Sequence, residues 1–509
     1  MKQSNFLNIY YIDWSKNKEA KNLMEAKKTA KFTTGINTKA IVAVLVFSAF
    51  IAVFNETILN VALSPLMVEM KVTAGTIQWI ITAYMIVVAV LVPVTAFLIQ
   101  SFETKQLYLG AMTLLLLGTI CAACSGSFVM LLISRMLQAS GTGMMIPIMM
   151  NTVLLVTPPE NRGSAMGICG CAISLGPALG PTVAGIVLQF LTWHALFIML
   201  IPIIILAMIL GSIYLVNVST ITKPKIDFIS IILSSIGFGG TIYGISSVSG
   251  NGNIKMIGII FIIGILSLIL FGKRQLSLKQ PMLDIRTFKY PIFSIGVVLV
   301  MISMMTIFTM NVMLPMFLQG ALRTTTFVAA MTLLPAALAN GVVTPIGGKI
   351  YDKFGVKVLV PVGFTIILVA LFILSRSNSD TSLIKIIVLY VLVCIGVGIT
   401  MSPCQTSALN QLPKEYYPHG VAILNTLQQI SAAIGSSLFI GIMSASQLKA
   451  LNNSAPEQIA VATGFRSGAI VAVIFVLVGL CLSFNLGFGN KKLDLSSELE
   501  LGSEEVNNI

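Results

Sequence analysis

The segment PPENRGSA at Pro158–Ala165 has a looser second copy, PKEYYPHGVA, at Pro413–Ala422. Pro158 and Pro413 are 255 residues apart and Gly163 and Gly420 are 257 apart, so an insertion of two residues aligns the two copies. A repeat at this spacing predicts that the chain contains two related halves. Internal duplication is a feature of transporter folds, in which the substrate binds between the halves near the bilayer midplane.

The composition of the chain is that of a membrane protein. Of its 509 residues, 56% are hydrophobic and 10% are charged, and the mean hydropathy is +0.95. Soluble domains carry about 25% charged residues, so these values exclude a soluble enzyme, a disordered chain and a disulfide scaffold. The seven cysteines lie in or beside apolar runs and are expected to behave as small buried hydrophobes. With only two histidines, we expect no metal site.

Fourteen apolar stretches are long enough, at roughly 20 residues each, to cross a bilayer as helices. They begin near Lys39, Thr76, Gln106, Phe128, Arg162, Ala195, Asp227, Asn253, Pro291, Thr325, Val356, Thr381, Pro418 and Phe465. We therefore predict an all-α membrane protein with two six-helix halves and a two-helix insertion. The expected parts are an N-terminal tail (1–38), six helices (39–216), an inserted helix pair (217–272), a linker (273–290), six helices (291–487) and an acidic tail (488–509).

The formal charge of +13 is unevenly distributed between the two sides of the predicted membrane protein. An even number of spans places both termini on one side, and that side holds 23 of the 31 Lys and Arg residues, against seven on the other. Positive charge marks the cytoplasmic side. We therefore expect a multi-pass protein of the cell membrane with both termini in the cytoplasm. The charge surplus then reflects topology, and no nucleic-acid partner is expected.

Glu56 is the one acidic residue, of eighteen, that lies well inside a span. Ser48, Ala52, Glu56 and Asn60 follow one another at four-residue steps, which predicts a small and polar stripe facing the helix bundle. A carboxylate in hydrocarbon is costly, and such residues usually mark the path of an ion or a substrate. We expect Glu56 to bind and release protons. The alternative is a protonated glutamate that only bridges helices.

Arg135 is the one basic residue well inside a span. Counted at 1.5 Å per residue, it lies about 10 Å from the outer end of its helix, and Glu56 lies about 15 Å from the outer end of its own. A pair or relay is therefore geometrically possible. Because arginine keeps its proton, Arg135 would tune the carboxyl group or hold Asn55 and Gln138. A static clamp between helices is the alternative.

Four segments together resemble the fourteen-helix drug:proton antiporter branch of the major facilitator superfamily, which includes exporters for lincomycin and quaternary ammonium compounds. They are NETILNVAL (Asn55–Leu63), RMLQASGTG (Arg135–Gly143), GPALGP (Gly176–Pro181) and GKIYDKFG (Gly348–Gly355), and the resemblance extends over about residues 38 to 490. It implies a multidrug exporter that needs no cofactor, is driven by the proton gradient, and exchanges protons for small lipophilic compounds that can be cationic. Its partners would be these substrates, protons and membrane lipids.

The resemblance also implies roles for individual residues. A hinge or seal is implied for Gly176, Pro177, Gly180 and Pro181, with close packing without motion as the alternative. A gating role is implied for Gly348, Asp352, Lys353 and Gly355, with solvated loop charge as the alternative for Asp352. We expect Asp352 to cap a helix or to bind its dipole.

Two segments depart from the family pattern. Asn55 occupies the usual place of an aspartate, and the carboxylate has moved one residue, about 100° around the helix, to Glu56. The first-half copy of the loop motif is degraded, so a gate built on its ionic contacts is expected to be weaker. Ala96, Gln100, Ser101 and Glu103 stand where Gly, Asp, Arg and Gly are usual.

Several polar residues at membrane depth could line a central substrate cavity or could instead bridge helices. They are Asn60, Tyr84, Gln138, Asn151, Asn311, Asn340, Gln405, Asn425 and Gln428. The chain contains no ATP-binding loop of the form G-x-x-x-x-G-K-[ST], which predicts secondary transport. Two alternatives keep the fold: an exporter dedicated to one metabolite, peptide or lipid-like signal, and a membrane sensor without transport. A membrane enzyme would require clustered catalytic groups, so we do not expect an enzyme.

Overall fold

The computed structural model describes residues 37–72, 74–77, 79–218, 221, 227–247, 254–278 and 280–487. The tail expected at 1–38, except residues 37 and 38, and the acidic tail expected at 488–509 lie outside the described residues. The chain divides into two units, Met1–Ile41 and Val42–Ile509. Of the first unit only residues 37–41 are described, and all other described residues belong to the second.

Fourteen helical segments within the described ranges are long and apolar enough to cross a membrane. The first six are α2 (Thr38–Ile58), α5 (Trp79–Ser101), α6 (Thr104–Ala123), α7 (Phe128–Val156), α8 (Arg162–Phe190) and the pair α9 and α10 (His194–Ile198, Leu200–Tyr214). Two more follow, α11 (Phe228–Ser247) and α12 (Ile254–Ser277). The last six are α13 (Pro291–Gly320), α14 (Thr326–Phe354), α15 (Val356–Leu374), α16 (Leu383–Asn410), α17 (Tyr417–Asn452) and α18 (Glu457–Ser483).

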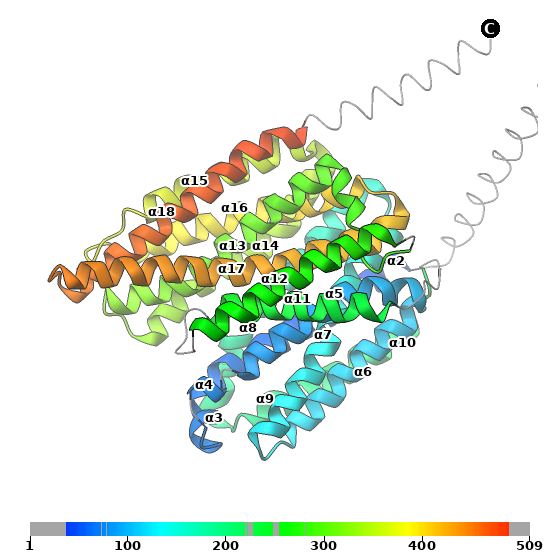
Figure 1. Ribbon diagram of the computed structural model, residues 1–509, viewed down its shortest axis with the longest axis horizontal. Coiled ribbons are helices and arrows are strands. Elements are labelled where there is room, and N and C mark those ends of the chain that lie inside the picture. The colour runs from blue at the N-terminus through cyan, green and yellow to red at the C-terminus, as the bar shows by residue number, and fades with distance from the viewer. Residues whose placement is uncertain are drawn as a thin grey trace, which may run out of the picture. The chain divides into compact units, whose positions relative to one another are not determined.

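The rest of the described chain consists of turns, loops and short helices, and the described residues form no β-strand (Figure 1). The short helices are η1 (Leu59–Ala62), α3 (Leu63–Glu69), α4 (Ala74–Ile77), η2 (Pro159–Asn161), η3 (Ile285–Lys289), η4 (Lys414–Tyr416) and η5 (Phe484–Gly487). The predicted all-helical class and the fourteen spans are therefore confirmed.

The two copies of the repeated segment have the same local structure. Each begins at a proline with nearly identical backbone angles: φ −56° and ψ 147° at Pro158, and φ −56° and ψ 150° at Pro413. In each copy a single 3₁₀ turn, η2 or η4, then leads directly into a long helix, α8 or α17. Proline favours this geometry because its fixed φ suits the entry to a helix.

Contacts between α8 and α14, and of α17 with α5 and α7, form a seam between the first six and the last six spans. α8 and α14 lie so close together that any side chain larger than that of glycine would overlap the other helix at the contact. A Cβ atom on Gly348 would collide with the carbonyl oxygen of Gly163, and one on Gly167 would lie 2.9 Å from the Cα atom of Pro345. Small residues permit such close helix packing in membranes.

The inserted helices lie against this seam. α11 packs on α12 and also on both α5 and α17. Ala89 of α5, Phe238 and Ile242 of α11, and Ile430 of α17 form one buried apolar cluster. The insertion is thus in contact with helices from both groups of six.

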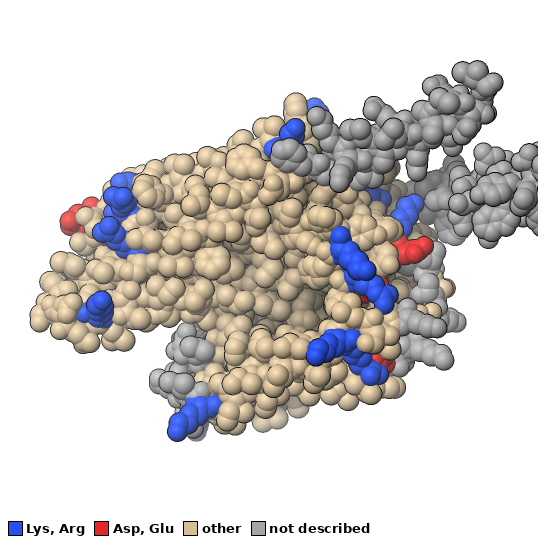
Figure 2. Space-filling model, turned by 45° about the horizontal axis from the view of Figure 1, so that its top comes forward, with Lys and Arg blue, Asp and Glu red and all other residues tan. Residues whose placement is uncertain are grey.

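The surface has the polarity expected of a protein in lipid. On the face shown in Figure 2, most of the charged side chains lie toward the two ends, and an uncharged band separates them. Large apolar side chains are exposed along the spans; on α12 they include Met256, Ile259, Ile262 and Leu270. Such exposure is unusual for a soluble protein and ordinary for a lipid-facing helix.

Candidate functional site

Arg135, which is 1% exposed, connects α7 to α2. Its Nη1 donates to the backbone carbonyl of Asn55 at 3.0 Å and to Gln138 Oε1 at 2.9 Å, and its Nη2 donates to the backbone carbonyl of Glu56 at 2.9 Å. α2 ends at Ile58 and continues as the 3₁₀ helix η1, so these two carbonyls belong to the last turn of α2. A carbonyl oxygen has two lone pairs and can accept from the guanidinium as well as from its own helix.

Tyr84 of α5 completes the surroundings of the guanidinium. The Arg135 Cζ atom lies 4.1 Å from the centroid of the Tyr84 ring, a cation–π contact. The Tyr84 hydroxyl shares a hydrogen bond of 2.7 Å with Thr142 of α7, and Gln138 Nε2 donates to Thr119 Oγ1 of α6 at 3.2 Å. Groups from four spans therefore fix the position of Arg135. We call Asn55, Glu56, Tyr84, Arg135 and Gln138 the buried polar cluster.

Glu56 is partly exposed, unlike the other members of this cluster. Among the described residues its carboxylate oxygens receive no hydrogen bond, and the two ion pairs lie elsewhere. Arg135 binds the main-chain carbonyl of Glu56, and no described hydrogen bond or ion pair holds the carboxylate. The arrangement therefore differs from a simple Glu56–Arg135 ion pair.

Three buried polar atoms next to Glu56 have no hydrogen-bond partner in the described part of the chain: Asn55 Nδ2, Asn55 Oδ1 and Arg135 Nε. Asn55 is 0% exposed. A buried polar group without a partner costs about 1–3 kcal/mol. The cluster thus holds two unused donors and one unused acceptor beside its only carboxylate.

Asp352, near the end of α14, caps the start of α8. Its Oδ1 accepts from the backbone N–H of Gly163 at 2.7 Å, and its Oδ2 accepts from the backbone N–H of Ser164 at 2.7 Å and from the Ser164 hydroxyl. The first N–H groups of a helix lack partners within the helix, and a carboxylate there also interacts favourably with the helix dipole. Asp352 therefore joins the last six spans to the first six.

Arg162, which is 7% exposed, makes a second connection at the same end of the seam. Its Nη1 donates at 2.8 Å both to Asn410 Oδ1 of α16 and to the hydroxyl of Tyr417. The Tyr417 ring also lies 5.4 Å from the Arg162 Cζ atom. Arg162 and Tyr417 are 255 residues apart, so they occupy equivalent positions in the two copies of the repeat.

Gln100, in the degraded first-half loop motif, faces His419 of α17. The two Nε2 atoms are 3.3 Å apart. On the other side of the ring, His419 Nδ1 accepts from the backbone N–H of Asp284 at 3.2 Å. The position equivalent to Asp352 thus carries a neutral contact, to which the linker before α13 also contributes.

The glycines of the GPALGP segment face α2, within the first six spans. A Cβ atom on Gly176 would lie 2.8 Å from Val53 Cγ1, and one on Gly180 would collide with the Thr57 hydroxyl oxygen. Thr57 Oγ1 donates to the Gly176 carbonyl at 3.4 Å. Pro177 is exposed and Pro181 is partly buried. The close approach to the last six spans is instead made nearer the start of α8, at Gly163 and Gly167.

Gly355 separates α14 from α15 with a φ of 73°. This left-handed conformation favours glycine, because a Cβ atom would crowd the backbone. Lys353 and the α14 helix end precede it, and the Lys353 side chain is exposed. The GKIYDKFG segment therefore supplies a close approach at Gly348, a cap at Asp352 and a turn at Gly355.

The other residues proposed for substrate binding are not gathered at one place by any described contact. Asn340 is buried and donates to the Cys394 carbonyl at 3.1 Å, Asn425 donates to Val421 O and to Met150 Sδ, and Tyr390 donates to the exposed Asn311 at 2.7 Å. Gln405 and Gln428 are buried, and the Nε2 atom of each lacks a partner in the described part of the chain. Asn60 lies in η1, and its side chain is outside the described residues.

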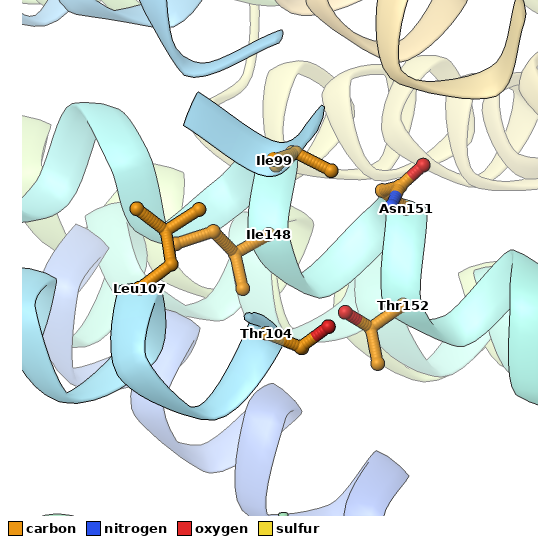
Figure 3. A pocket seen from close by; sticks show the side chains of 6 residues that line it. All are labelled: Ile99, Thr104, Leu107, Ile148, Asn151 and Thr152. Carbon is orange, nitrogen blue, oxygen red and sulfur yellow. The ribbon is translucent and has the colours of Figure 1, made fainter. Parts of the chain in front are cut away.

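Asn151 lines a small pocket between α5, α6 and α7 with Ile99, Thr104, Leu107, Ile148 and Thr152 (Figure 3). The pocket is too narrow to hold even a water molecule, whereas drug-sized ligands occupy sites of roughly 300–1,000 Å³. It is too small to be the substrate cavity. Across the described residues, no three His, Cys, Asp or Glu side chains are grouped so that they could hold a metal ion.

Sequence reasoning did not single out Arg162, Tyr417, His419, Thr119 or Thr142. A usable signal existed for the first two, because equivalent positions of an internal repeat often meet at the axis that relates the copies. The roles of Thr119 and Thr142 depend on which helices are neighbours, and that information is absent from the pattern along the chain.

Comparisons with known proteins agree with this geometry. Residues 45–436 match the family model of the Major Facilitator Superfamily. The "Lincomycin resistance protein LmrB" of Bacillus subtilis (strain 168) is 43% identical over 470 residues, which cover 91% of this chain and 98% of that protein. The protein of the same name from Listeria monocytogenes serovar 1/2a is 42% identical over 450 residues, covering 87% and 95% of the two chains.

The fold also matches a solved structure. The crystal structure of the human organic anion transporter MFSD10 (TETRAN) aligns with a TM-score of 0.60 and 11% identity, covering 88% of this chain and 99% of that one. At this identity the likeness concerns the fold alone. Taken with the family match and the LmrB relatives, it leaves one assignment: the chain belongs to the Major Facilitator Superfamily and is a membrane transporter, not an enzyme.

Proposed function

We propose that this protein is a proton-coupled multidrug exporter, which removes small lipophilic compounds that can carry a positive charge. One observation carries the coupling: Glu56 is partly exposed, its carboxylate accepts no described hydrogen bond, and Arg135 holds the main chain on which it sits. The relatives named as lincomycin resistance proteins support a drug as the cargo. The energy source is the proton gradient, and no cofactor takes part.

In this proposal Glu56 takes up a proton from one side of the membrane and releases it to the other. The charged carboxylate is stabilised by the unused donors beside it, Arg135 Nε and Asn55 Nδ2. A cationic substrate and a proton compete for the same negative charge, so that binding of one displaces the other. Asn55 therefore assists the shifted carboxylate at Glu56, and Arg135 keeps the last turn of α2 in place during the exchange.

The charge bias of the loops supports cytoplasmic termini, and the end of the seam at Asp352 and Arg162 is then the cytoplasmic end. In this proposal, the contacts of Asp352 and Arg162 belong to a state in which this end is closed. Alternating access opens it by breaking the contacts that Asp352 and Arg162 make across the seam.

α8 connects the gate with the proton site. Its first residues are capped by Asp352, and its middle packs on α2 through Gly176 and Gly180. A movement of α8 at the seam is therefore transmitted to the helix that carries Glu56. The glycines make this coupling tight because they bring the two backbones together, and Pro177 and Pro181 permit α8 to bend.

The substrate site in this proposal lies at membrane depth beside Glu56. Tyr84 and Gln138 belong to the buried polar cluster, and Asn311, Gln405, Asn425 and Gln428 contribute polar groups from the last six spans. Asn60 belongs to the same proposed set, although its side chain lies outside the described residues. Asn151 and Asn340 are the weaker members of this set, since Asn151 lines the small pocket and Asn340 bonds to a neighbouring helix.

The functional proposal is tested by uptake of a fluorescent amphipathic cation into inverted membrane vesicles. Vesicles that contain the protein are expected to accumulate the dye when the interior is acidified and to lose this activity when a protonophore collapses the gradient. Competition by lincomycin and by several unrelated lipophilic cations supports a multidrug exporter, and competition by a single compound supports a dedicated exporter. Uptake that is insensitive to the protonophore contradicts proton coupling.

Replacing Asp352 with asparagine is expected to lower the rate of dye uptake about tenfold. Asparagine offers one acceptor oxygen in place of two charged ones, so part of the α8 cap is lost. Hydrogen bonds to charged groups contribute about 1.5–3 kcal/mol, and 1.4 kcal/mol corresponds to a factor of ten in the ratio of closed to open states.

The matched control is Asp380→Asn, which alters an exposed aspartate between α15 and α16 and should leave uptake unchanged. Equal uptake by Asp352→Asn and Asp380→Asn, at equal expression, would show that the cap has no part in transport.

A further inference from the structure

A continuous series of hydrogen bonds runs from the inserted helices to the seam between the two groups of six spans. Ser230 of α11 accepts from Gln275 Nε2 of α12 at 2.5 Å. Gln275 Oε1 in turn accepts from the backbone N–H of Leu283, in the linker, at 3.1 Å. The next residue, Asp284, donates its backbone N–H to His419 Nδ1 of α17, and His419 Nε2 faces Gln100 of α5.

The members of this series are enclosed in protein. Gln275 and Ser230 are 0% exposed, Leu283 is 3% and His419 is 7% exposed. Hydrogen bonds shielded from water are stronger than exposed ones, and a buried group that loses its partner is costly. The linker therefore does not merely connect α12 to α13 but is bound at defined points.

A charged pair anchors the inserted end of the series. Arg274 donates from Nε and Nη2 to the two carboxylate oxygens of Asp227, at 2.7 and 2.9 Å, and Ser230 Oγ donates to Asp227 Oδ2 at 2.6 Å. These bonds, chiefly those from Arg274, lower the pKa of Asp227 to about 2. The carboxylate is thus charged over the whole physiological pH range, and it fixes Ser230, the first member of the series.

The series of hydrogen bonds ends at His419, whose ring lies against Gln100 across the seam. Because Nδ1 accepts from Asp284, Nε2 carries the ring proton and, like Gln100 Nε2, can only donate, so this last contact is not a hydrogen bond. Gln100 belongs to the first six spans and His419 to the last six, and α11 packs on both α5 and α17. The inserted helices therefore pack on both sides of the α5–α17 junction and are also hydrogen-bonded to α17 through the linker. Separation of α5 from α17 requires either that the inserted pair leave α5, or that it leave α17 and the linker leave His419.

We propose that the inserted helix pair acts through its linker as a clasp that holds the α5–α17 end of the seam closed, with Gln275 and His419 as its two attachment points. The clasp takes the place of the ionic contact that the degraded first-half loop motif lacks, since Gln100 stands at the position equivalent to Asp352. This inference assigns a regulatory role within the proposed transport cycle, and it rests on that cycle.

The test measures the width of this end of the seam directly. Spin labels are attached at Phe102→Cys and Lys414→Cys, two exposed positions on opposite sides of the seam, after replacement of the seven native cysteines. The variants are Gln275→Leu, which removes both Gln275 hydrogen bonds, and His419→Phe, which keeps an aromatic ring without the acceptor nitrogen. In each variant, the ratio of the population at the closed distance to the population at the open distance is expected to fall about fivefold. This is the effect of losing one hydrogen bond worth about 1 kcal/mol.

Ser267→Ala is the matched control. Ser267 donates to the Leu233 carbonyl at 2.8 Å, a bond that joins α12 to α11 and does not involve the linker. The Ser267→Ala variant should therefore show the same distance distribution as the wild type. A second label pair, Phe102→Cys with Val129→Cys, lies within the first six spans and reports correct folding of each variant. The clasp is overturned when correctly folded Gln275→Leu and His419→Phe both show the wild-type distribution.

The measurement needs neither substrate nor a proton gradient. Unchanged distances would therefore contradict the clasp proposal without contradicting the proposal of proton-coupled export. Failure of the dye-uptake assay would contradict the proposal of proton-coupled export, and the measured distances would remain valid.

Discussion

Glu56→Gln is expected to reduce proton-driven dye uptake into inverted vesicles to the level of vesicles without the protein. Glutamine has nearly the same size and can hydrogen-bond, but it cannot release a proton at any pH reached in the assay. The main chain at position 56 still accepts from Arg135, because that bond uses the carbonyl oxygen. The change therefore removes the proton carrier and leaves the contacts of the last turn of α2.

Two comparisons make this result specific. Glu457→Gln alters an exposed glutamate in the first turn of α18 and should transport like the wild type. Dye binding to purified Glu56→Gln should be weaker than to the wild type, because the negative charge is lost, but should remain detectable, because the fold and the remaining polar groups are unchanged. A variant that binds dye and still accumulates it at the wild-type rate would make Glu56 a structural residue.

Arg135→Lys is expected to lower uptake at least tenfold, although it preserves the charge. The two terminal nitrogens of Arg135 reach two backbone carbonyls and Gln138 in a planar fork. Lysine carries a single ammonium group and cannot reproduce this geometry. At least one hydrogen bond from the charged side chain to a carbonyl is lost, which is worth about 1.5–3 kcal/mol, and the last turn of α2 shifts relative to α7.

Arg466→Lys, an exposed position on α18, is the control for the chemical change itself. If Arg135→Lys and Arg466→Lys transport equally well, a positive charge near Glu56 is sufficient and the fork of hydrogen bonds is not needed. Gln138→Leu separates the contributions further, because it removes the side-chain acceptor and leaves both carbonyl contacts intact.

The fold follows from simple properties of the sequence. Lipid requires that backbone groups be satisfied within each span, so an apolar stretch of sufficient length has few choices besides a helix. The two copies of the repeat also fold alike, each with a 3₁₀ turn before a long helix. For these reasons composition and periodicity are enough to predict an all-helical protein with fourteen spans.

The candidate site is less accessible to sequence reasoning. A charge within an apolar run is conspicuous, and Glu56 and Arg135 stand out on that ground. Their relation is not predictable, because a guanidinium can bind either a carboxylate or a carbonyl, and the choice depends on how α2 and α7 are rotated. The structure places Arg135 on the carbonyls of Asn55 and Glu56.

Contacts at the seam depend on which helices are neighbours. The sequence shows Gly163 only as a residue that both repeat copies share. In the structure, the lack of a side chain at Gly163 leaves room for Asp352 to bind the start of α8. The linker poses the same difficulty. Nothing along the chain indicates that the backbone of Leu283 and Asp284 binds Gln275 and His419.

The central claim is that a proton on Glu56 is exchanged for substrate, and it is tested most directly by proton release from the purified protein. Substrate is added to the protein in weakly buffered detergent solution, and the change in pH is recorded for the wild type and for Glu56→Gln. The account predicts that substrate releases protons from the wild type and none from Glu56→Gln. Equal proton release from the two proteins would contradict it.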